Sequence, residues 1–402
     1  MIILKKIIIP LLIIVFLFSG CQLKKNEITP PEPSTQVPLT ETKTVEEPEL
    51  RGIWISCFDL ENTSGKTREE YGKLSDEMFC RISEAGLDTA FVHLRAFSDA
   101  LYQSELFPTS KYIAKYRGAN LNYDPFEVML ESAGKYNISV HGWINPFRIS
   151  YNNDPALLCE NEAASRYIKS KSTAVGILPS GIFYNPASTE AQKLILDGIR
   201  EILTKYDIDG IHIDDYFYPE DCEKLDFAEF EAYKASGGAL EKSEWRRATV
   251  DAFVSAIYNT VKSFSPELIF SISPGARKDV NYNELFADCE KWLSSEGYAD
   301  LIIPQLYFGF KREGFNFSTL FDEWDSVKRC SAVRIACGLA LYKAGTDESE
   351  EWHDEPEVIA AQIDAVRERK WNGFVIFSYS DLLRNEASAP VEKIKERIKD
   401  SK

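Results

Sequence analysis

Two adjacent carboxylates, Asp214 and Asp215, stand at the end of a short apolar run and are followed by aromatic residues. Burying such groups without partners is costly. When two carboxyl groups lie close together, one keeps its proton to a higher pH than usual, as an acid that works near neutral pH requires. The pair therefore predicts acid–base chemistry, although a capping or salt-bridging pair that closes the loop would use the same residues.

Further polar and aromatic side chains follow other candidate strands, on the face that strand alternation directs to the interior. Aromatic rings stack on the C–H faces of sugars and polar groups bind the hydroxyls, so the set predicts a sugar-binding cup. The candidate substrate-binding residues are His93, Arg95, Trp143, Asn145, Arg148, Tyr216, Tyr218, Arg277, Gln305, Tyr307, Tyr379 and Asp381. Three have a structural alternative: His93 as an interior histidine, Trp143 as barrel filling, and Arg95 as an ion-pair partner of the aspartates.

Eight short apolar runs alternate with longer amphipathic segments and position these residues. We predict strands at 51–57, 88–95, 138–145, 209–214, 268–273, 300–308, 333–341 and 373–379, and helices near 67–85, 124–136, 188–206, 243–264, 282–296, 318–329, 355–370 and 389–400. This alternation predicts an α/β fold, a (β/α)8 TIM barrel, whose chemistry lies in the loops after the strands. The segment 148–184 is predicted to be one of these loops. A doubly wound sheet would use the same elements, but no glycine-rich phosphate-binding turn follows the first strand.

The composition limits the possible partners of the chain. It has 402 residues and a net charge of −17, which disfavours binding to nucleic acid or anionic lipid through charge. The length suits one large barrel or two average domains. Eight cysteines do not make a disulfide scaffold, and four histidines leave little room for a histidine-rich metal site. We therefore expect no metal and no cofactor.

The first 50 residues have the features of an export segment. A basic head, an apolar stretch over 7–18 and a small-residue exit predict a signal peptide over 1–20, with an uncleaved anchor as the alternative. Cys21 follows Phe-Ser-Gly and so resembles the cysteine of a bacterial lipobox, which implies cleavage before Cys21 and its lipidation. The proline-rich stretch 21–50 predicts a flexible tether, and the barrel is expected to occupy 51–400.

Five segments together resemble the bacterial glycosyl-hydrolase-like family 10. They are RGIWIS at 51–56, FVHLR at 91–95, HGWINPFR at 141–148, DGIHIDDYFYP at 209–219 and IIPQLYF at 302–308. The similarity spans about residues 51–385. It implies a (β/α)8 glycosidase-type domain in exported bacterial proteins, some of whose relatives are similar to enzymes that cut the glycan strands of peptidoglycan. An exported lipoprotein, anchored in the cell envelope through Cys21, fits such a substrate.

Glycoside cleavage commonly uses two carboxyl groups, and in many barrel glycosidases the second lies at the end of the seventh strand. Here that strand ends at 338–342 without an acid. Adjacent carboxylates after the fourth strand resemble sites in which the N-acetyl group of the sugar assists. Asp214 is expected to orient the acetamide and Asp215 to protonate the leaving oxygen, or the reverse. Tyr307 and Asn145 are expected to bind the acetamide or the developing charge.

The predicted function is cleavage of N-acetylated glycan strands, peptidoglycan in particular. One alternative is a glycosidase that acts on another polysaccharide, and a second is a barrel that binds glycan without cutting it. A third, a metal-dependent deacetylase, is disfavoured because His93, His141 and His212 lie on three different predicted strands.

Overall fold

The structure is a computed structural model that describes residues 48–399. The predicted signal peptide, Cys21 and most of the predicted tether lie outside the described residues. Strand β1 begins at Leu50, and the neighbouring Glu49 side chain pairs with Arg51 at 3.0 Å and with Arg367 at 2.7 Å. The folded unit therefore includes Glu49 and Leu50. Within 48–399, no helix has both the length and the apolar character needed to cross a membrane.

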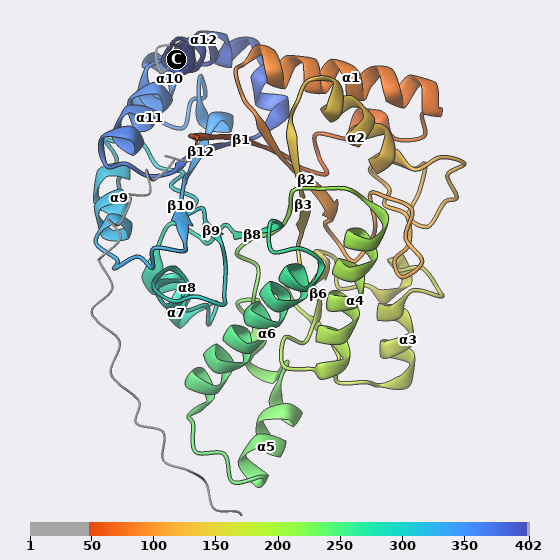
Figure 1. Cartoon of the computed structure of the whole chain (residues 1–402). Helices are drawn as coiled ribbons and strands as arrows, with labels where there is room; N and C mark the ends of the chain where they lie inside the picture. Colours follow the sequence, from red (N-terminus) through yellow and green to blue (C-terminus); the bar gives the residue numbers. More distant parts are fainter. Residues whose placement is uncertain (1–47, 400–402) are drawn as a thin grey trace, which may run out of the picture. The chain divides into compact units, whose positions relative to one another are not determined.

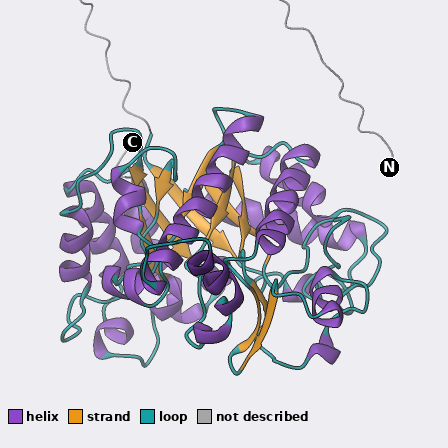
Figure 2. Cartoon of the chain, turned by 90° about the horizontal axis from the view of Figure 1, so that it is seen from below, coloured by secondary structure: helices purple, strands orange, loops and turns teal. Residues whose placement is uncertain are grey.

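Parallel strands form a barrel, which confirms the predicted fold class. The barrel strands are β1 (Leu50–Ile55), β2 (Thr89–Arg95), β3 (Ser139–Ile144), β7 (Gly210–Ile213), β8 (Ile269–Ile272), β9 (Leu301–Ile302), β10 (Arg334–Ile335), β11 (Cys337–Ala340) and β12 (Gly373–Phe377). They pair in the order β10-β9-β8-β7-β3-β2-β1-β12-β11. Because one residue separates β10 from β11, these two are halves of the predicted seventh strand, and they bring the two ends of the sheet together. Figure 2 shows the strands gathered inside a layer of helices.

The predicted helices follow the strands, and Figure 1 shows them around the barrel. They are α1 (Arg68–Glu84), α2 (Pro125–Lys135), α4 (Thr189–Lys205), α6 (Lys242–Phe264), α9 (Phe317–Asp325), α11 (Val358–Glu368) and α12 (Ser388–Lys399). Side-chain caps start several of them: Asp124 accepts a hydrogen bond from the Phe126 amide, and Ser188 accepts one from the Ala191 amide. The helix predicted over 282–296 is instead two short helices, α7 (Lys278–Asn283) and α8 (Cys289–Ser294).

The segment predicted as a loop over 148–184 has its own structure. It holds β4 (Arg148–Ser150), helix α3 (Ala163–Ser170), β5 (Val175–Leu178) and β6 (Gly181–Tyr184), with the strands paired antiparallel in the order β4-β6-β5. Two further helices, α5 (Phe227–Ala235) and α10 (Glu350–Asp354), also lie outside the predicted ones. Pairing of β4 with β6 holds the backbone at Arg148, four residues after the end of β3.

Strand alternation separates two apolar layers, as the sequence predicts. In β7, Ile211 and Ile213 belong to the large core between the strands and the helices. The barrel interior holds a smaller cluster: Trp54, Phe91, Trp143, Leu301, Ile303, Ala336 and Val375. His212 and Asp214 occupy the other face of β7 and are 0% and 3% exposed. This interior cluster supports the side chains at the carboxyl ends of the strands.

Candidate active site

A pocket of about 240 Å³ opens at the carboxyl ends of the barrel strands. Residues from all around the ring line it: Trp54, Ser56, Phe58, His93, Trp143, Arg148, Tyr151, Asp214, Asp215, Tyr216, Ser273, Gln305, Tyr307, Tyr342 and Phe377. The two predicted catalytic aspartates are among them, with six of the twelve predicted substrate-binding residues. Among the residues that the structure describes, Asp214 and Asp215 are the only acidic side chains in this lining.

Asp214 is held firmly on one side of its carboxyl group and left open on the other. The Trp143 indole N–H donates to Asp214 Oδ2 at 3.2 Å, and the Asn145 amide donates to the same oxygen at 3.3 Å. Asp214 Oδ1 is buried and has no hydrogen-bond partner within residues 48–399. Burial, reinforced by the charge of Asp215, raises the pKa of Asp214 to about 7. An unpaired buried oxygen of this kind is costly unless a ligand or solvent satisfies it.

Asp215 follows directly and faces the loop after β8. A Cβ atom at Gly275 would lie 3.4 Å from Asp215 Oδ2, so the carboxyl group reaches van der Waals distance of this loop. Burial raises the pKa of Asp215 to about 6, while Gln305 and Arg148 act in the opposite direction. Two carboxyl groups with raised pKa values thus lie in one pocket. Such a pair can hold one proton and one negative charge near neutral pH.

His93 and Arg148 present polar groups to the same pocket. The His93 ring stacks on Trp143 with centroids 3.7 Å apart, and neither ring nitrogen has a partner in the described structure. Burial lowers the pKa of His93 well below its usual value, so the ring is neutral at pH 7. The Arg148 guanidinium is buried and lies 4.1 Å from the Tyr216 ring centroid, with Nε and Nη1 unpaired within 48–399. These donors and acceptors are available to sugar hydroxyl and amide groups.

His212 has a structural role beneath the pocket. Trp54 donates its indole N–H to His212 Nε2 at 3.1 Å, so that nitrogen is an acceptor and Nδ1 carries the proton. The Ser271 hydroxyl lies 2.8 Å from Nδ1, and the Ser273 hydroxyl lies 3.0 Å from Nε2. His212 is therefore a satisfied interior histidine. In the part of the chain that the structure describes, no three His, Cys, Asp or Glu side chains converge as metal ligands would.

Two predicted site residues on β2 and β3 lie outside the pocket lining. The β2–β3 register shifts between His93 and Arg95, and this irregularity turns Arg95 away from the interior. Its guanidinium donates to the backbone oxygens of Asn145 and Pro146 at 2.9 and 3.1 Å and lies over the Phe107 ring. The prediction that Arg95 points inward is wrong for this reason. Asn145 contacts Asp214, so it positions a carboxyl group rather than lining the pocket.

Four predicted residues beyond other strand ends also miss the pocket. Tyr218 is buried with its ring 5.2 Å from the Arg246 guanidinium, and Arg277 pairs with Asp279 beside a different cavity. Tyr379 and Asp381 lie in a 3-10 helix after β12, where Asp381 pairs with Arg384 at 2.8 Å. All four lie after the observed strands, where the backbone no longer has a two-residue period that would direct a side chain to the interior.

Seven pocket residues are not among the candidate site residues: Trp54, Ser56, Phe58, Tyr151, Ser273, Tyr342 and Phe377. The alternation in β1 places Trp54 and Ser56 on one face, so a period-two signal for them was present in the sequence. Tyr151 follows β4 in the inserted sheet, whose existence was not predicted. Phe58 and Tyr342 lie after their strands, where no periodic signal applies.

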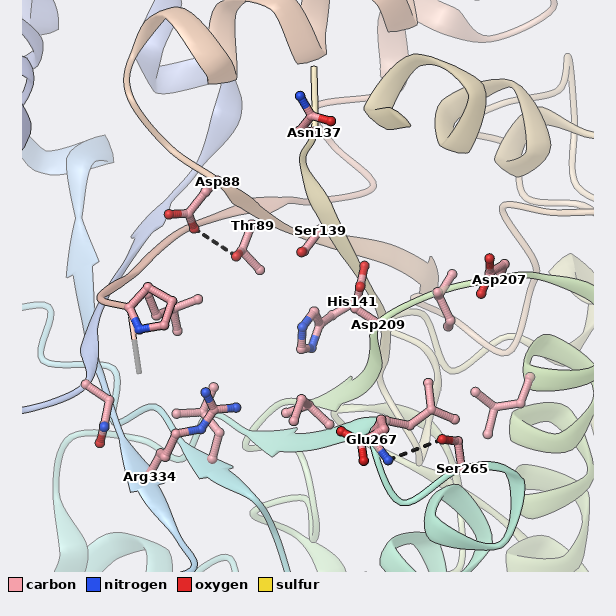
Figure 3. A pocket seen from close by; sticks show the side chains of 18 of the residues that line it. Asp88, Thr89, Asn137, Ser139, His141, Asp207, Asp209, Ser265, Glu267 and Arg334 are labelled. Carbon is pink, nitrogen blue, oxygen red and sulfur yellow. Dashed lines mark hydrogen bonds between the residues drawn. The ribbon is translucent and has the colours of Figure 1, made fainter. Parts of the chain in front are cut away.

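A larger cavity, about 930 Å³, lies at the opposite ends of the strands. Figure 3 shows Asp88, His141, Asp209 and Arg334 among the side chains around it. Two of its acidic groups bind the backbone: Asp88 accepts from the Arg51 amide at 3.2 Å, and Asp209 accepts from the Val140 amide at 2.7 Å. Burial lowers the pKa of His141 to about 3. These carboxylates fix the register of neighbouring strands.

The sequence of the chain and its parallel barrel together are those of a glycoside hydrolase. The chain belongs to the family described as Glycosyl hydrolase-like 10, whose profile matches residues 49–354. It is 31% identical over 363 residues to Glycosyl hydrolase YngK of Bacillus subtilis, with 84% of this chain and 69% of that protein covered. It is 29% identical over 356 residues to Glycosyl hydrolase DigH of Escherichia coli K12, with 79% of this chain and 80% of that protein covered.

A solved structure has the same fold. The glycoside hydrolase domain of PgaB (BpsB) from Bordetella bronchiseptica matches with a TM-score of 0.58 at 11% sequence identity, covering 86% of this chain and 99% of that one. At this identity the likeness concerns the fold alone. Family membership and fold together confirm the predicted family, barrel and enzyme class.

Proposed function

We propose that this enzyme hydrolyses N-acetylated glycan strands, and peptidoglycan strands in particular, through Asp214 and Asp215. The observation that carries the proposal is the adjacent pair itself, with both pKa values raised and an unpaired oxygen on Asp214. No acid of the described chain faces the pair across the pocket. A protein nucleophile on the far side of the sugar therefore has no candidate, whereas the sugar's own acetamide oxygen fills that role.

In this mechanism the acetamide oxygen attacks the anomeric carbon while the glycosidic oxygen takes a proton and leaves. One carboxylate holds the acetamide N–H and balances the developing positive charge, and the other carboxyl group supplies the proton. Water then opens the cyclic intermediate and returns a proton to the pair. The Tyr307 side chain lines the same pocket and would donate to the acetamide oxygen.

The hydrogen bonds around the pair favour one division of roles between the two aspartates. Burial raises the pKa of both carboxyl groups, so the pair keeps a shared proton to a higher pH than an exposed pair would. Trp143 and Asn145 fix Oδ2 of Asp214 as an acceptor and leave Oδ1 to carry that proton. Asp214 is accordingly the proposed acid and Asp215 the carboxylate, the second of the two assignments that the sequence allows.

The proposed location is the bacterial cell envelope. A signal peptide over 1–20 and a lipid on Cys21 would hold the barrel near its polymer, with 21–48 as the tether. Metabolic labelling with a fatty acid, compared between the full-length wild type and Cys21→Ala, tests this part separately. Label in the wild type alone supports it, and no label in either overturns it.

The substrate is tested with purified strands by mass analysis of the products. De-peptidated peptidoglycan strands are compared with the same strands after chemical removal of the N-acetyl groups. The proposal expects cleavage of the acetylated strands and a loss of at least about 100-fold without the acetyl groups, since the nucleophile is then absent. Equal cleavage of both would contradict assistance by the substrate. Cleavage only of an unrelated polysaccharide would contradict the proposed substrate.

A further inference from the structure

The catalytic pocket is small for a polymer-cutting enzyme. Its volume is about 240 Å³, below the range of about 300–1,000 Å³ that is typical of ligand pockets. A second pocket, of about 430 Å³, lies next to it, and Tyr151 lines both. The pocket that contains the aspartates therefore adjoins a larger neighbour at Tyr151.

The Arg148 guanidinium marks the junction between the two pockets. Its central carbon lies 4.1 Å from the ring centroid of Tyr216, which belongs to the catalytic pocket. The same atom lies 4.9 Å from the ring of Phe97, which belongs to the second pocket, and 4.5 Å from the ring of Tyr151. Rings from both pockets thus pack around one buried cation.

The second pocket has the surface that a sugar ring requires. Tyr151 is 57% exposed and Leu157 is 59% exposed, which leaves apolar faces open at its rim. Lys111 and Asn152 add exposed polar groups. Its other cation, Arg117, is already paired with Asp99 at 3.4 Å and Glu162 at 2.9 Å. Recognition there depends on apolar contact and a few hydrogen bonds.

Two other pockets of similar size near the carboxyl ends of the strands lack this continuity. One contains Arg277 and Phe315, and another contains Phe308 and Lys343. Among the described residues, neither shares a lining residue with the catalytic pocket. The Tyr151 side is therefore the direction in which a long substrate continues.

We propose that the pocket bounded by Phe97, Tyr151 and Leu157 is a further sugar subsite, which binds the next unit of an N-acetylated glycan strand. This rests on the proposed function and adds to it that the enzyme prefers long strands to short fragments. The inserted segment over 148–184 contains two of these three residues: Tyr151 follows β4, and Leu157 lies in a 3-10 helix over Pro155–Leu157. Its role is then to extend the site along the polymer.

The test measures kcat/KM on de-peptidated strands fractionated by length, from the shortest fragment that is cleaved upward. The wild type is expected to gain at least about 10-fold from shortest to longest, as one added apolar contact provides. Leu157→Ala removes exposed apolar surface, and Asn152→Trp fills the pocket. Both are expected to lose most of that gain while cleaving the shortest fragment as the wild type does. Circular dichroism checks that both variants fold.

Phe315→Ala is the matched control, since Phe315 is also an exposed ring, at 41%, beside a pocket of similar volume. It is expected to keep the wild-type dependence on length. If Leu157→Ala and Asn152→Trp both keep that dependence as well, the subsite is refuted while the proposed function stands. If the wild type cleaves no N-acetylated strand of any length, the proposed function fails and the subsite fails with it.

Discussion

An aspartate lies at each end of strand β7, and the two carboxyl groups differ in their hydrogen bonding. Asp209 precedes the strand and accepts a hydrogen bond from the Val140 amide at 2.7 Å. Asp214 follows the strand, and its Oδ1 is buried with no partner in the described chain. The first belongs to the cavity of about 930 Å³ and the second to the pocket of about 240 Å³. In this strand the aspartate with an unpaired carboxyl oxygen is the one in the smaller pocket, so the state of the carboxyl group, and not volume, marks the proposed catalytic end.

The same contrast extends around the barrel. At the amino-terminal ends, Asp300 accepts from the Phe270 amide at 2.8 Å, and Asn372 accepts from the Ile335 amide at 3.0 Å. Each of these residues comes directly before a strand and binds the backbone of another strand. At the carboxyl ends, His93 and Arg148 keep nitrogens without partners within 48–399. The carboxylates and the amide at the amino-terminal ends fix the strands, although His141 Nδ1 in that cavity is also unpaired. The carboxyl ends leave several donors and acceptors available to a substrate.

The largest expected effect is the loss of glycan cleavage when either aspartate at the carboxyl end of β7 is replaced. Asp214→Asn and Asp215→Asn are each expected to lower kcat on de-peptidated strands by about 100- to 10,000-fold, the usual size of a general-acid contribution. An aryl glycoside with a good leaving group needs no acid, so it should restore much of the activity of Asp214→Asn and little of that of Asp215→Asn. Steady-state kinetics with both substrates measures this. Rescue of Asp215→Asn alone would reverse the assigned roles.

The second effect is a bell-shaped dependence of activity on pH. Productive turnover needs one proton on the pair, and the two pKa values are raised to about 7 and about 6. Activity should fall as pH rises above about 7, because the acid is lost, and as pH falls below about 6, because the carboxylate becomes protonated. The profile of kcat/KM measures both limbs. A flat profile across this range would show that the pair does not titrate as a catalytic unit.

A third experiment concerns the other end of β7. Asp209→Ala removes the charged acceptor of the Val140 amide, and because Asp209 is exposed, water can replace it. The free energy of unfolding is expected to fall by about 1–2 kcal/mol. The kcat value on glycan strands should stay close to that of the wild type, because Asp209 is not in the catalytic pocket. Urea denaturation and kinetics give the two readouts. A large loss of kcat with unchanged stability would break the comparison between the ends.

The smallest expected effect is an increase in the free energy of unfolding when Asp214 is replaced by asparagine. The pKa of Asp214 is raised in the folded state, so folding favours the protonated form, and ionisation weakens the fold as pH rises through about 7. The side chain stays neutral in Asp214→Asn, so this variant is expected to be more stable than the wild type by about 1 kcal/mol at pH 8. This value corresponds to part of the rise in the pKa of Asp214. Thermal unfolding at pH 4 should show no such gain. Destabilisation at pH 8 would contradict the buried charge as the cause.

Features that follow a regular period along the chain, such as the alternation of side chains in a strand, could be predicted from the sequence. Within strands, alternation correctly directed His93, Trp143 and Asp214 to the interior, because a two-residue period holds wherever the pleat holds. The eight strand positions also followed, since buried parallel strands have short apolar runs. The acidic pair could be identified because burying two adjacent carboxylates after an apolar run costs free energy unless they have partners or a function.

The remaining errors arise where the backbone leaves a regular period. The register shift before Arg95 has no sequence signature that a period can detect. Arg277 and Asp381 lie in turns and short helices after strands, and each is held by a neighbouring charge rather than by strand geometry. The small sheet over 148–184 consists of strands of three or four residues, too short for a reliable alternation. Tyr151 was missed with it.

The central claim is that the aspartates after β7 cut an N-acetylated glycan strand. Mass spectrometry of de-peptidated peptidoglycan, digested in parallel by the wild type, Asp214→Asn, Asp215→Asn and Asp209→Ala, tests it most directly. The account predicts short saccharides with new reducing ends from the wild type and Asp209→Ala, and intact strands from the other two. Equal products from all four proteins would contradict the account, since the bond would then be cut without the pair.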